Sequence, residues 1–467
     1  MRSVKPLTIL LILSLLVTLF AGCGSTKPEV NNPEKSDNPT TKPVEKSKLK
    51  VWTMGRPDKE YYLSKINPFN ETNPDGIEIV YEVFTDNYPQ TIELAYATGE
   101  GPDVYLDANG VYEKMLPMGN LMPLDQFLTE DYKKRFGEGA FLEGINMYEG
   151  KIYSMPGIGS SARLIYNKGI FAKAGISAPP KSLDELVETA RTITNKLKGE
   201  GIYGFAANLK TPLSAFNRSI DYIVMRSGGV RSGYDFKNGK YNFDDYRPVL
   251  EAYREIFAKD IAFPGCESLE IDPLRTQFAA GKIGMYISWS HAEPNVYAHQ
   301  FTTTEEWDVA QIPTIDGTVK GSTNIFFAGR WYVMNSKTKD PQKAWKVMEL
   351  LYSDEVAKGY YENGFGLLMI PSIVEKAKKP ASIEERPELA FTQYDKMWPG
   401  LPINVSPEGK DMYSVYAAVV LGVTDLDAAI QDLNTRYNAA FEKAISEGKT
   451  KRILNPDFDP FNPGKGF

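Results

Sequence analysis

The chain has 467 residues, well above the size at which a single hydrophobic core stops growing, so we expect two lobes or domains. It contains 53 basic and 60 acidic side chains, and its net charge of −7, with no long basic stripe, argues against a nucleic-acid partner. Two cysteines and two histidines exclude a disulfide framework, and we expect no metal or other cofactor.

Residues 1–22 have the organisation of a lipoprotein signal peptide. Arg2 and Lys5 precede an apolar run at 7–20, which is shorter than the roughly 20 residues that span a bilayer. Two small residues then lead to Cys23. The segment resembles the bacterial lipoprotein signal, in which this cysteine takes a diacylglycerol and becomes the first mature residue. The alternative is an ordinary secretory signal with an incidental cysteine.

Residues 23–47 are polar, and Val30 and Val44 are the only large apolar side chains after the signal. Such a segment cannot bury enough surface to fold, so we expect a flexible tether that reaches about 25–30 Å. A lipid on Cys23 would then hold the protein at the extracytoplasmic face of the cell membrane. Cys266 would be the remaining thiol, and we expect it to be a small buried hydrophobe.

The remainder of the chain alternates between predicted strands and helices. Runs rich in β-branched and aromatic residues predict strands at 49–52, 77–83, 104–106, 202–205, 283–287 and 331–334. Polar sequence at 61–69 is compatible with a helix. Ser182 and Glu185 form a capping box before an apolar stripe, and Asp340 precedes a proline at a first helical position. The alternation predicts an α/β fold in which helices cover the sheets.

Catalytic motifs are missing from the sequence. It contains no phosphate-binding loop, no dinucleotide fingerprint, no HExxH, no CxxC and no GxSxG. His291 and His299 are eight residues apart, which fits no metal-ligand spacing. A carboxylate pair for glycoside hydrolysis cannot be recognised among 60 acidic residues, so a surface glycoside hydrolase or lyase remains an alternative.

A series of segments in a fixed order resembles the extracellular solute-binding proteins of ABC importers, the sugar-binding family that includes maltose-binding protein. The segments are GPDV at 101–104, GNLMPLD at 119–125, YSMP at 153–156, LIYNK at 164–168, FAKAGI at 171–176, PPKSLDEL at 179–186, QFAAGKIGM at 277–285 with Trp289, NSK at 335–337, AW at 344–345 and SDE at 353–355. Their order and spacing extend over residues 48–452.

The resemblance implies a two-lobed periplasmic-binding-protein-like fold with hinge crossovers and a ligand in the interlobe cleft. It places the first lobe at 48–154 plus 330–380, the second at 155–329 plus 381–452, and a short tail at 453–467. It also implies a monomer that captures a mono- or oligosaccharide and works with an ABC permease, not an enzyme. A non-sugar solute and a sensor role are the alternatives.

A sugar has hydroxyls at its rim and apolar faces, so its site needs aromatic rings and fixed hydrogen-bonding groups. Trp289 occupies the family's recurrent stacking position, and its polar neighbours predict an exposed loop. Trp52 ends a predicted strand at the edge where α/β sheets bind ligands. Asp107 lies at a similar edge, where it either accepts from ligand hydroxyls or caps a turn. For both tryptophans, packing inside the protein is the alternative.

Further candidates come from the predicted crossovers and the second lobe. Ser160 falls where maltose-binding protein has an acidic ligand contact, which argues against a maltose-like binding pattern. Arg163 either compensates for the missing acidic contact by binding the ligand itself or forms a surface salt bridge. Arg330 and Trp331 lie beside a crossover, where they offer a guanidinium or backbone amides. Finally, two aromatic residues are expected to close the cleft from the second lobe, namely Trp398, in a predicted loop at 398–402, and Tyr413.

Overall fold

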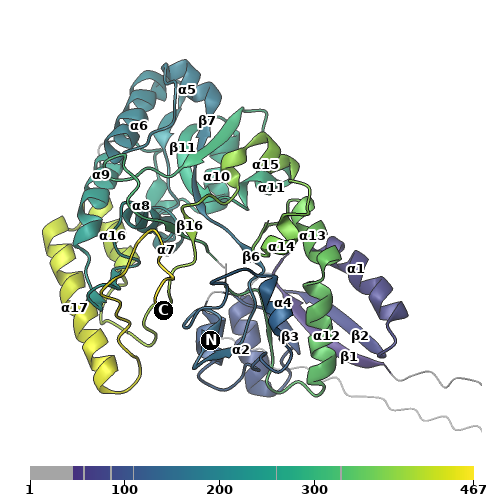
Figure 1. Cartoon of the computed structure of the whole chain (residues 1–467). Helices are drawn as coiled ribbons and strands as arrows, with labels where there is room; N and C mark the ends of the chain where they lie inside the picture. The colour runs from purple at the N-terminus through teal and green to yellow at the C-terminus, as the bar shows by residue number, and fades with distance from the viewer. Residues whose placement is uncertain (1–45, 56–57, 85–86, 109, 259, 327–328) are drawn as a thin grey trace, which may run out of the picture. The chain divides into compact units, whose positions relative to one another are not determined.

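The computed structural model describes residues 46–55, 58–84, 87–108, 110–258, 260–326 and 329–467. The predicted signal peptide, Cys23 and the predicted tether up to residue 45 lie outside the described residues. Residues Lys46–Phe467 form one unit, in which the elements alternate as expected for an α/β protein (Figure 1). Within the described part of the chain, no helix has both the length and the apolar character needed to cross a bilayer.

The first lobe is built on a four-stranded sheet of order β14-β3-β1-β2. β1 is parallel to β2 and to β3, whereas β14 is antiparallel to β3. The predicted bounds of β2 and β3 are confirmed, and β1 and β14 lie within one or two residues of their predicted positions. The strands are β1 (Ser47–Thr53), β2 (Ile77–Val83), β3 (Val104–Leu106) and β14 (Tyr332–Met334).

Helices cover this sheet because each has one apolar face. In α12, the predicted cap is confirmed, since the Asp340 side chain accepts from the Lys343 backbone N–H at 3.1 Å. Its four stripe residues, Ala344, Val347, Met348 and Leu351, are fully buried, and each of the three larger ones contributes about 1.5–3 kcal/mol. The main covering helices are α1 (Lys59–Thr72), α2 (Tyr88–Thr98), α12 (Pro341–Leu351) and α13 (Asp354–Glu362).

The second lobe is built on a mixed sheet of order β12-β7-β11-β8. Its central strand β7 is antiparallel to both β11 and β12, and β8 is parallel to β11. The strands are β7 (Ala162–Asn167), β8 (Tyr203–Phe205), β11 (Ile283–Trp289) and β12 (Trp307–Gln311). Helices around them include α5 (Lys168–Ala174), α6 (Leu183–Leu197), α9 (Arg247–Ala258), α10 (Ile271–Ala279), α16 (Met412–Val420) and α17 (Leu426–Ser446).

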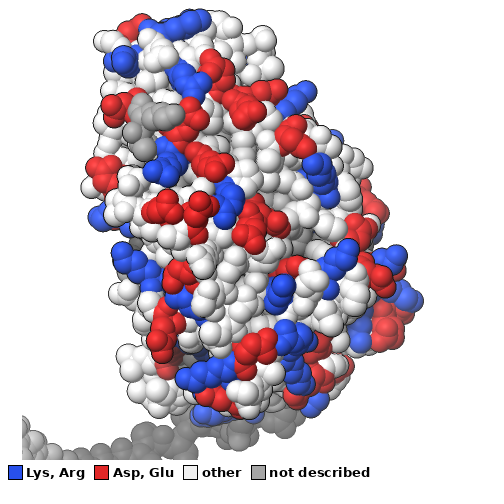
Figure 2. All heavy atoms as spheres, turned by 90° about the vertical axis from the view of Figure 1, so that its left-hand side faces the viewer, with Lys and Arg blue, Asp and Glu red and all other residues white. Residues whose placement is uncertain are grey.

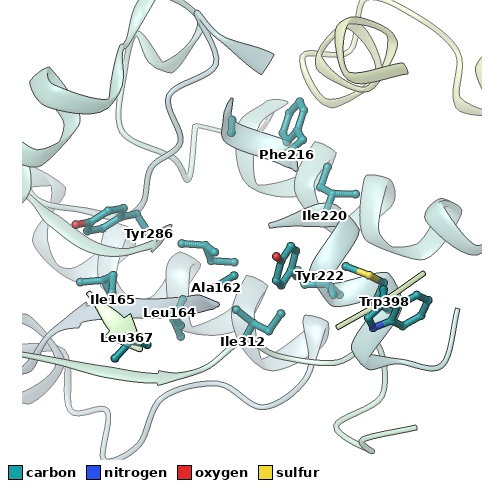
Figure 3. Packing of buried hydrophobic residues seen from close by; sticks show 14 of the residues in the cluster. Ala162, Leu164, Ile165, Phe216, Ile220, Tyr222, Tyr286, Ile312, Leu367 and Trp398 are labelled. Atoms are coloured by element: carbon teal, nitrogen blue, oxygen red, sulfur yellow. The ribbon is translucent and has the colours of Figure 1, made fainter. Parts of the chain in front are cut away.

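The core of the second lobe joins its sheet to the helices beside it. Figure 3 shows Ala162, Leu164 and Ile165 of β7 together with Phe216 and Tyr222 from the helices α7 (Pro212–Phe216) and α8 (Ile220–Arg226). The capping box predicted before α6 is confirmed in part, because Ser182 Oγ accepts from the Glu185 backbone N–H at 3.1 Å. The Glu185 carboxylate accepts from the backbone N–H of Lys181 instead of that of Ser182.

The chain passes between the sheets through segments that pair with one another. In Figure 1, β6 (Ile158–Gly159) lies between the two sheets, and it pairs with β15 (Leu367–Leu368). Directly after β6, Ser160 and Phe326 exchange two backbone hydrogen bonds of 2.9 and 2.7 Å. These paired crossovers connect the lobes while leaving each sheet separate.

The last residues of the chain pack against the second lobe. The Phe458 ring stacks on Phe236 with centroids 5.2 Å apart, and Ser322 N donates to the Pro460 carbonyl at 2.8 Å. We call residues 453–467 the C-terminal tail. It lies beside two short strands that pair in parallel, β13 (Thr323–Asn324) and β16 (Asp395–Lys396).

Short elements complete the described structure. They are α3 (Val111–Met115), α4 (Glu130–Lys134), β4 (Met147–Tyr148), β5 (Lys151–Ile152), η1 (Lys198–Glu200), β9 (Tyr234–Asp235), β10 (Lys240–Tyr241), η2 (Asp244–Tyr246), η3 (Cys266–Ser268), α11 (Glu293–Asn295), the π-helical turn η4 (Val296–Gln300), α14 (Pro371–Val374), α15 (Ala381–Glu385) and η5 (Pro387–Leu389). Figure 2 shows acidic and basic side chains interspersed over the face that carries α17, without a large patch of one sign.

Candidate ligand-binding site

The main cavity, of about 590 Å³, lies between the two lobes. Its first wall comes from the carboxyl ends of β1 and β3 and from the start of β14, the edge at which α/β sheets usually bind ligands. Its second wall comes from the turn after β11 and from η4. The lining residues are Thr53, Met54, Gly55, Asp58, Leu106, Asp107, Ile158, Gly159, Ser160, His291, Ala292, Asn295, Val296, His299, Gln300, Arg330, Trp331, Tyr332, Tyr360 and Phe365.

Asp58 is a buried carboxyl group on the first-lobe wall. Its Oδ2 accepts from the Tyr360 hydroxyl at 3.1 Å, whereas its Oδ1 is buried and has no hydrogen-bond partner among the described residues. Burial raises the pKa of the Asp58 carboxyl, because an ion is poorly solvated there. A ligand hydroxyl that donates to Oδ1 would remove the cost of this unpaired oxygen.

His291 lies opposite, on the second-lobe wall. Its Nδ1 is buried and has no partner among the described residues. Burial lowers the pKa of the imidazole to about 4, so the ring is neutral at physiological pH. Ser160, on the same wall, places its hydroxyl 3.3 Å from that of Ser290. Each lobe thus contributes to the cavity lining a residue with an unpaired buried polar atom, and the other lining residues include Met54, Leu106 and Phe365.

An ion-paired arginine, Arg330, lines the main cavity. Arg330 Nε lies 3.0 Å from Asp107 Oδ2, and its Nη1 lies 2.7 Å from Glu113 Oε1. The guanidinium also lies over the Tyr112 ring, 4.6 Å from its centroid. Burial raises the pKa of Asp107, although Arg330 opposes that effect. Asp107 Oδ1 accepts from the backbone N–H of Tyr112, so the side chain also holds the turn before α3.

Two further cavities adjoin the main one. A cavity of about 520 Å³ shares Asn295 and His299 with it and continues along α15. A smaller cavity of about 180 Å³, which we call the side chamber, shares Asp107 and Arg330 with the main cavity. The site is therefore a main cavity with an extension on either side.

Four of the predicted site residues lie on the main cavity wall, namely Asp107, Ser160, Arg330 and Trp331. Trp331 is almost completely buried, with its ring against Tyr352 and Tyr360. Gly157 makes room for this ring, since a Cβ at that position would lie only 1.9 Å from Trp331 Cε3. The ring therefore forms a rigid part of the cavity wall.

Two predicted stacking residues do not line the main cavity. Trp52 is buried in β1, where its indole N–H donates to Glu82 at 2.7 Å, and the next residues, beginning with Thr53, reach the cavity instead. Trp289 is the last residue of β11 and stacks on Phe326 with centroids 4.6 Å apart. The prediction of an exposed loop around Trp289 was wrong, because both flanking serines are buried.

Arg163 is also placed away from the cavity, and the surface salt bridge that we considered for it was wrong. Its side chain is buried and forms a bidentate ion pair with Asp395 inside the second lobe. Trp398 lies in a loop as predicted, but it is fully buried because the tail covers it, and it borders the side chamber. The Tyr413 hydroxyl donates to the buried Asp221 at 2.6 Å, so this side chain packs in the interior of the second lobe and does not line the main cavity.

The sequence did not identify Asp58, Tyr360 and the two histidines as cavity residues. His291 follows Trp289 closely, but a histidine at this position predicts a base or a metal ligand as readily as a residue of a sugar site. Asp58 is six residues beyond Trp52, and the end of a strand was the signal that could have pointed to it. Among the described residues, no group of three or more potential ligands is arranged to hold a metal ion.

Known proteins are similar to this chain in sequence and in fold. The family model described as bacterial extracellular solute-binding protein matches residues 55–358. The maltodextrin-binding protein MdxE of Bacillus subtilis is 24% identical over 352 residues, which are 75% of this chain and 77% of MdxE. The sn-glycerol-3-phosphate-binding periplasmic protein UgpB of Agrobacterium fabrum is 24% identical over 404 residues, 80% of this chain and 88% of UgpB.

A solved structure described under xylan utilization by the thermophilic bacterium Caldanaerobius polysaccharolyticus superposes with a TM-score of 0.68 at 22% identity. The match covers 83% of this chain and 99% of that one, so the two-lobed fold expected from the sequence is confirmed. The family model matches well over half of the chain, and its members bind solutes instead of transforming them. The chain therefore belongs to the bacterial extracellular solute-binding proteins and is not a surface glycoside hydrolase or lyase.

Proposed function

We propose that the protein is the lipid-anchored, extracytoplasmic binding subunit of an ABC importer and that it captures a carbohydrate between its lobes. The observation that carries this proposal is one cavity lined from both lobes, in which the lining residues Asp58 and His291 each hold an unpartnered polar atom, Oδ1 and Nδ1. Unpaired polar groups cost about 1–3 kcal/mol each, which a hydroxyl-rich ligand recovers on binding. The apolar surface between them suits the C–H faces of a sugar ring.

The comparisons support a carbohydrate ligand. MdxE is named for maltodextrin, and the solved structure above is described under xylan utilization. The volume of about 590 Å³ lies within the range of about 300–1,000 Å³ usual for small-ligand sites. The extension beyond Asn295 gives room for a second sugar unit. UgpB, named for sn-glycerol-3-phosphate, is the observation that favours a non-sugar solute as the second candidate.

Closure by hinge bending is part of the proposal. The cavity walls belong to different lobes, and the crossovers at β6 and Phe326 are short paired segments between them. A ligand that contacts both walls favours the closed arrangement, because it gains its full set of contacts only there. Small-angle scattering should then show a smaller radius of gyration with ligand than without it.

Binding is tested with purified protein and a panel of neutral mono- and oligosaccharides, by isothermal titration and by the midpoint of thermal unfolding. The Asp58→Asn variant should bind the best ligand about tenfold or more weakly, because a charge-assisted hydrogen bond is lost. Asp316→Asn, at a partly exposed carboxylate paired with Lys320, is the matched control and should bind as the wild type does. A full panel without any binding would refute the carbohydrate assignment.

Anchoring rests on Cys23 and the apolar run before it. Cells expressing the protein are labelled with a palmitate analogue and fractionated. We expect label and membrane association in the wild type, and a Cys23→Ser variant without the label in the soluble fraction. Cys266→Ser is the control, since that thiol is buried, and it should keep the label. Labelled Cys23→Ser protein would contradict the proposal.

A further inference from the structure

The side chamber contains an arginine whose charge is incompletely matched. Arg231, in the loop between α8 and β9, lines the chamber, and its Nη1 donates to the Pro399 carbonyl at 2.6 Å. Among the described residues, Arg231 has no carboxylate within ion-pair distance. The carboxylate that acts on it most is Asp221, which is already held by three hydroxyl groups, those of Ser232, Tyr246 and Tyr413. Arg231 is half-buried, and an arginine that is withdrawn from solvent is normally paired with an anion.

The chamber places a second guanidinium opposite the first. Arg330 reaches it from the first lobe and Arg231 from the second. Burial lowers the pKa of Arg231, and the charge of Arg330 adds to this effect. Arg330 has its own counter-ions, Asp107 and Glu113. Asp107 also faces the chamber, but both of its oxygens are engaged, by Arg330 and by Tyr112 N.

The chamber has room for an anionic group and lies next to the main cavity. Its volume of about 180 Å³ is an order of magnitude above the roughly 10–15 Å³ that admits one water molecule. It shares Asp107 and Arg330 with the main cavity, so the two cavities lie side by side. Its other walls are formed by Ile145, Ile325 and Met397, among others, which keep the dielectric low around a bound charge.

We propose that the side chamber is an anion subsite, in which Arg231, with Arg330 opposite, binds a carboxylate or phosphate group carried by the ligand. This inference rests on the proposed function and narrows it to an acidic carbohydrate, such as a uronate-containing or phosphorylated sugar. A guanidinium binds such groups through two parallel hydrogen bonds. Because the arginines belong to different lobes, the anion is held fully only when the lobes are closed.

The test compares matched sets of three ligands by isothermal titration with the full chain in detergent. Each set contains a neutral gluco-, manno- or galacto-oligosaccharide, its C6 carboxylate and its C6 phosphate. We expect an acidic member to bind about tenfold or more tightly than its neutral match, which corresponds to about 1.4 kcal/mol. The carboxylate and phosphate arms show which of the two groups fits the chamber.

Arg231→Gln should remove the preference for the acidic member and change neutral binding less than about threefold. Arg231→Lys should retain part of the preference, because the charge remains while the bidentate geometry is lost. The matched control Arg436→Gln removes an arginine of α17 that pairs with Asp432 and should keep the full preference. The proposal is overturned if wild-type protein binds neutral members as tightly as acidic ones, or if Arg231→Gln keeps the preference.

A failure of the proposed function gives a different result. If no member of any set binds, the carbohydrate assignment fails, and inorganic phosphate and sulfate then test the subsite alone. Either anion should raise the thermal midpoint relative to chloride at equal ionic strength, and Arg231→Gln should abolish that rise. Equal midpoints in all salts would overturn the anion subsite as well.

Discussion

Replacing Asp395 by asparagine should destabilise the second lobe strongly. The Asp395 carboxylate is buried and contacts Arg163 twice, with Nη2–Oδ2 at 2.8 Å and Nη1–Oδ1 at 3.2 Å. The hydroxyls of Ser161, Thr323 and Thr392 also donate to it. Asparagine keeps the shape but removes the charge, so the Arg163 guanidinium would stay buried without its counter-ion.

The size of the effect follows from the burial of the pair. Removing one partner of a buried ion pair costs about 3–5 kcal/mol, because the other charge remains in a poorly solvating interior. Burial tends to raise the pKa of Asp395, but Arg163 and the hydrogen bonds outweigh it and lower the pKa to about 2. Compared with the ordinary value of 3.8, this corresponds to roughly 2–3 kcal/mol of stability.

The pKa also gives the direction of the pH dependence. Because the folded-state pKa lies below the unfolded-state value, the ionised Asp395 stabilises the fold fully above about pH 4. That contribution is lost as the pH falls from about 4 towards about 2. The difference in unfolding free energy between wild type and Asp395→Asn should therefore be constant near neutral pH and should narrow in acid.

The assay is urea unfolding followed by tryptophan fluorescence and far-ultraviolet circular dichroism, at pH 7, 5, 4, 3 and 2.5. The exposed-site variant Asp316→Asn is the control and should stay within about 0.5 kcal/mol of the wild type. The reasoning would be refuted if the unfolding free energy of Asp395→Asn lay within about 1 kcal/mol of the wild-type value at pH 7. It would also be refuted if the difference between these two free energies did not narrow below pH 4. Replacing Arg163 and Asp395 together by methionine and leucine should cost less than Asp395→Asn alone.

Three further predictions concern packing. Gly157→Ala should lower the free energy of unfolding by about 1–3 kcal/mol and shift the fluorescence emission of Trp331, because the added Cβ would overlap the Trp331 ring. Gly199→Ala is the control, because a Cβ there meets no atom within 4 Å, and it should change neither quantity. Equal urea midpoints for the two variants would contradict this reasoning. The Cys266 thiol, whose pKa burial raises to about 12, should react with a disulfide reagent only upon unfolding, and rapid native-state labelling would show it to be accessible. Removing the C-terminal tail should lower the midpoint of thermal unfolding by several degrees, because it uncovers the rings of Phe236 and Trp398. An unchanged midpoint would show that the packing of the tail is dispensable.

The secondary structure could be predicted well because its signals are local. β2 and β3 begin and end where their runs of β-branched and aromatic residues do. The caps of α6 and α12 depend on residues within one helical turn, and both side chains cap as expected. The order of the strands in the sheets did not follow from such signals, and the resemblance to a known family supplied the two-lobed fold.

The candidate site could be predicted only in part, because contacts across the chain decide it. The sequence predicts Asp107 and Arg330 independently, and their ion pair joins residues that only the sheet brings together. Asp58 stands before α1, where an aspartate usually caps the helix, yet its side chain makes no capping hydrogen bond. It accepts instead from Tyr360, 302 residues further along the chain.

Burial of large aromatic side chains was the least predictable feature. Trp398 lies in a proline-rich loop, which is typical of an exposed segment, but the tail covers it and its indole N–H donates to Ser322 at 3.1 Å. Trp289 lies among serines and a histidine, a polar neighbourhood that is typical of an exposed loop, but Ser288 and Ser290 are both buried. Local polarity does not determine exposure where distant segments cover a loop.

The order of strands in the first sheet has a consequence for how the chain matures. β3 pairs with β14 only after the whole second-lobe sheet has been synthesised, since β14 ends at Met334. Until then one side of β3 is an open edge, and the first lobe lacks its last strand. Such long-range pairing is slow. The first lobe can therefore complete its sheet only after most of the chain, up to Met334, is available.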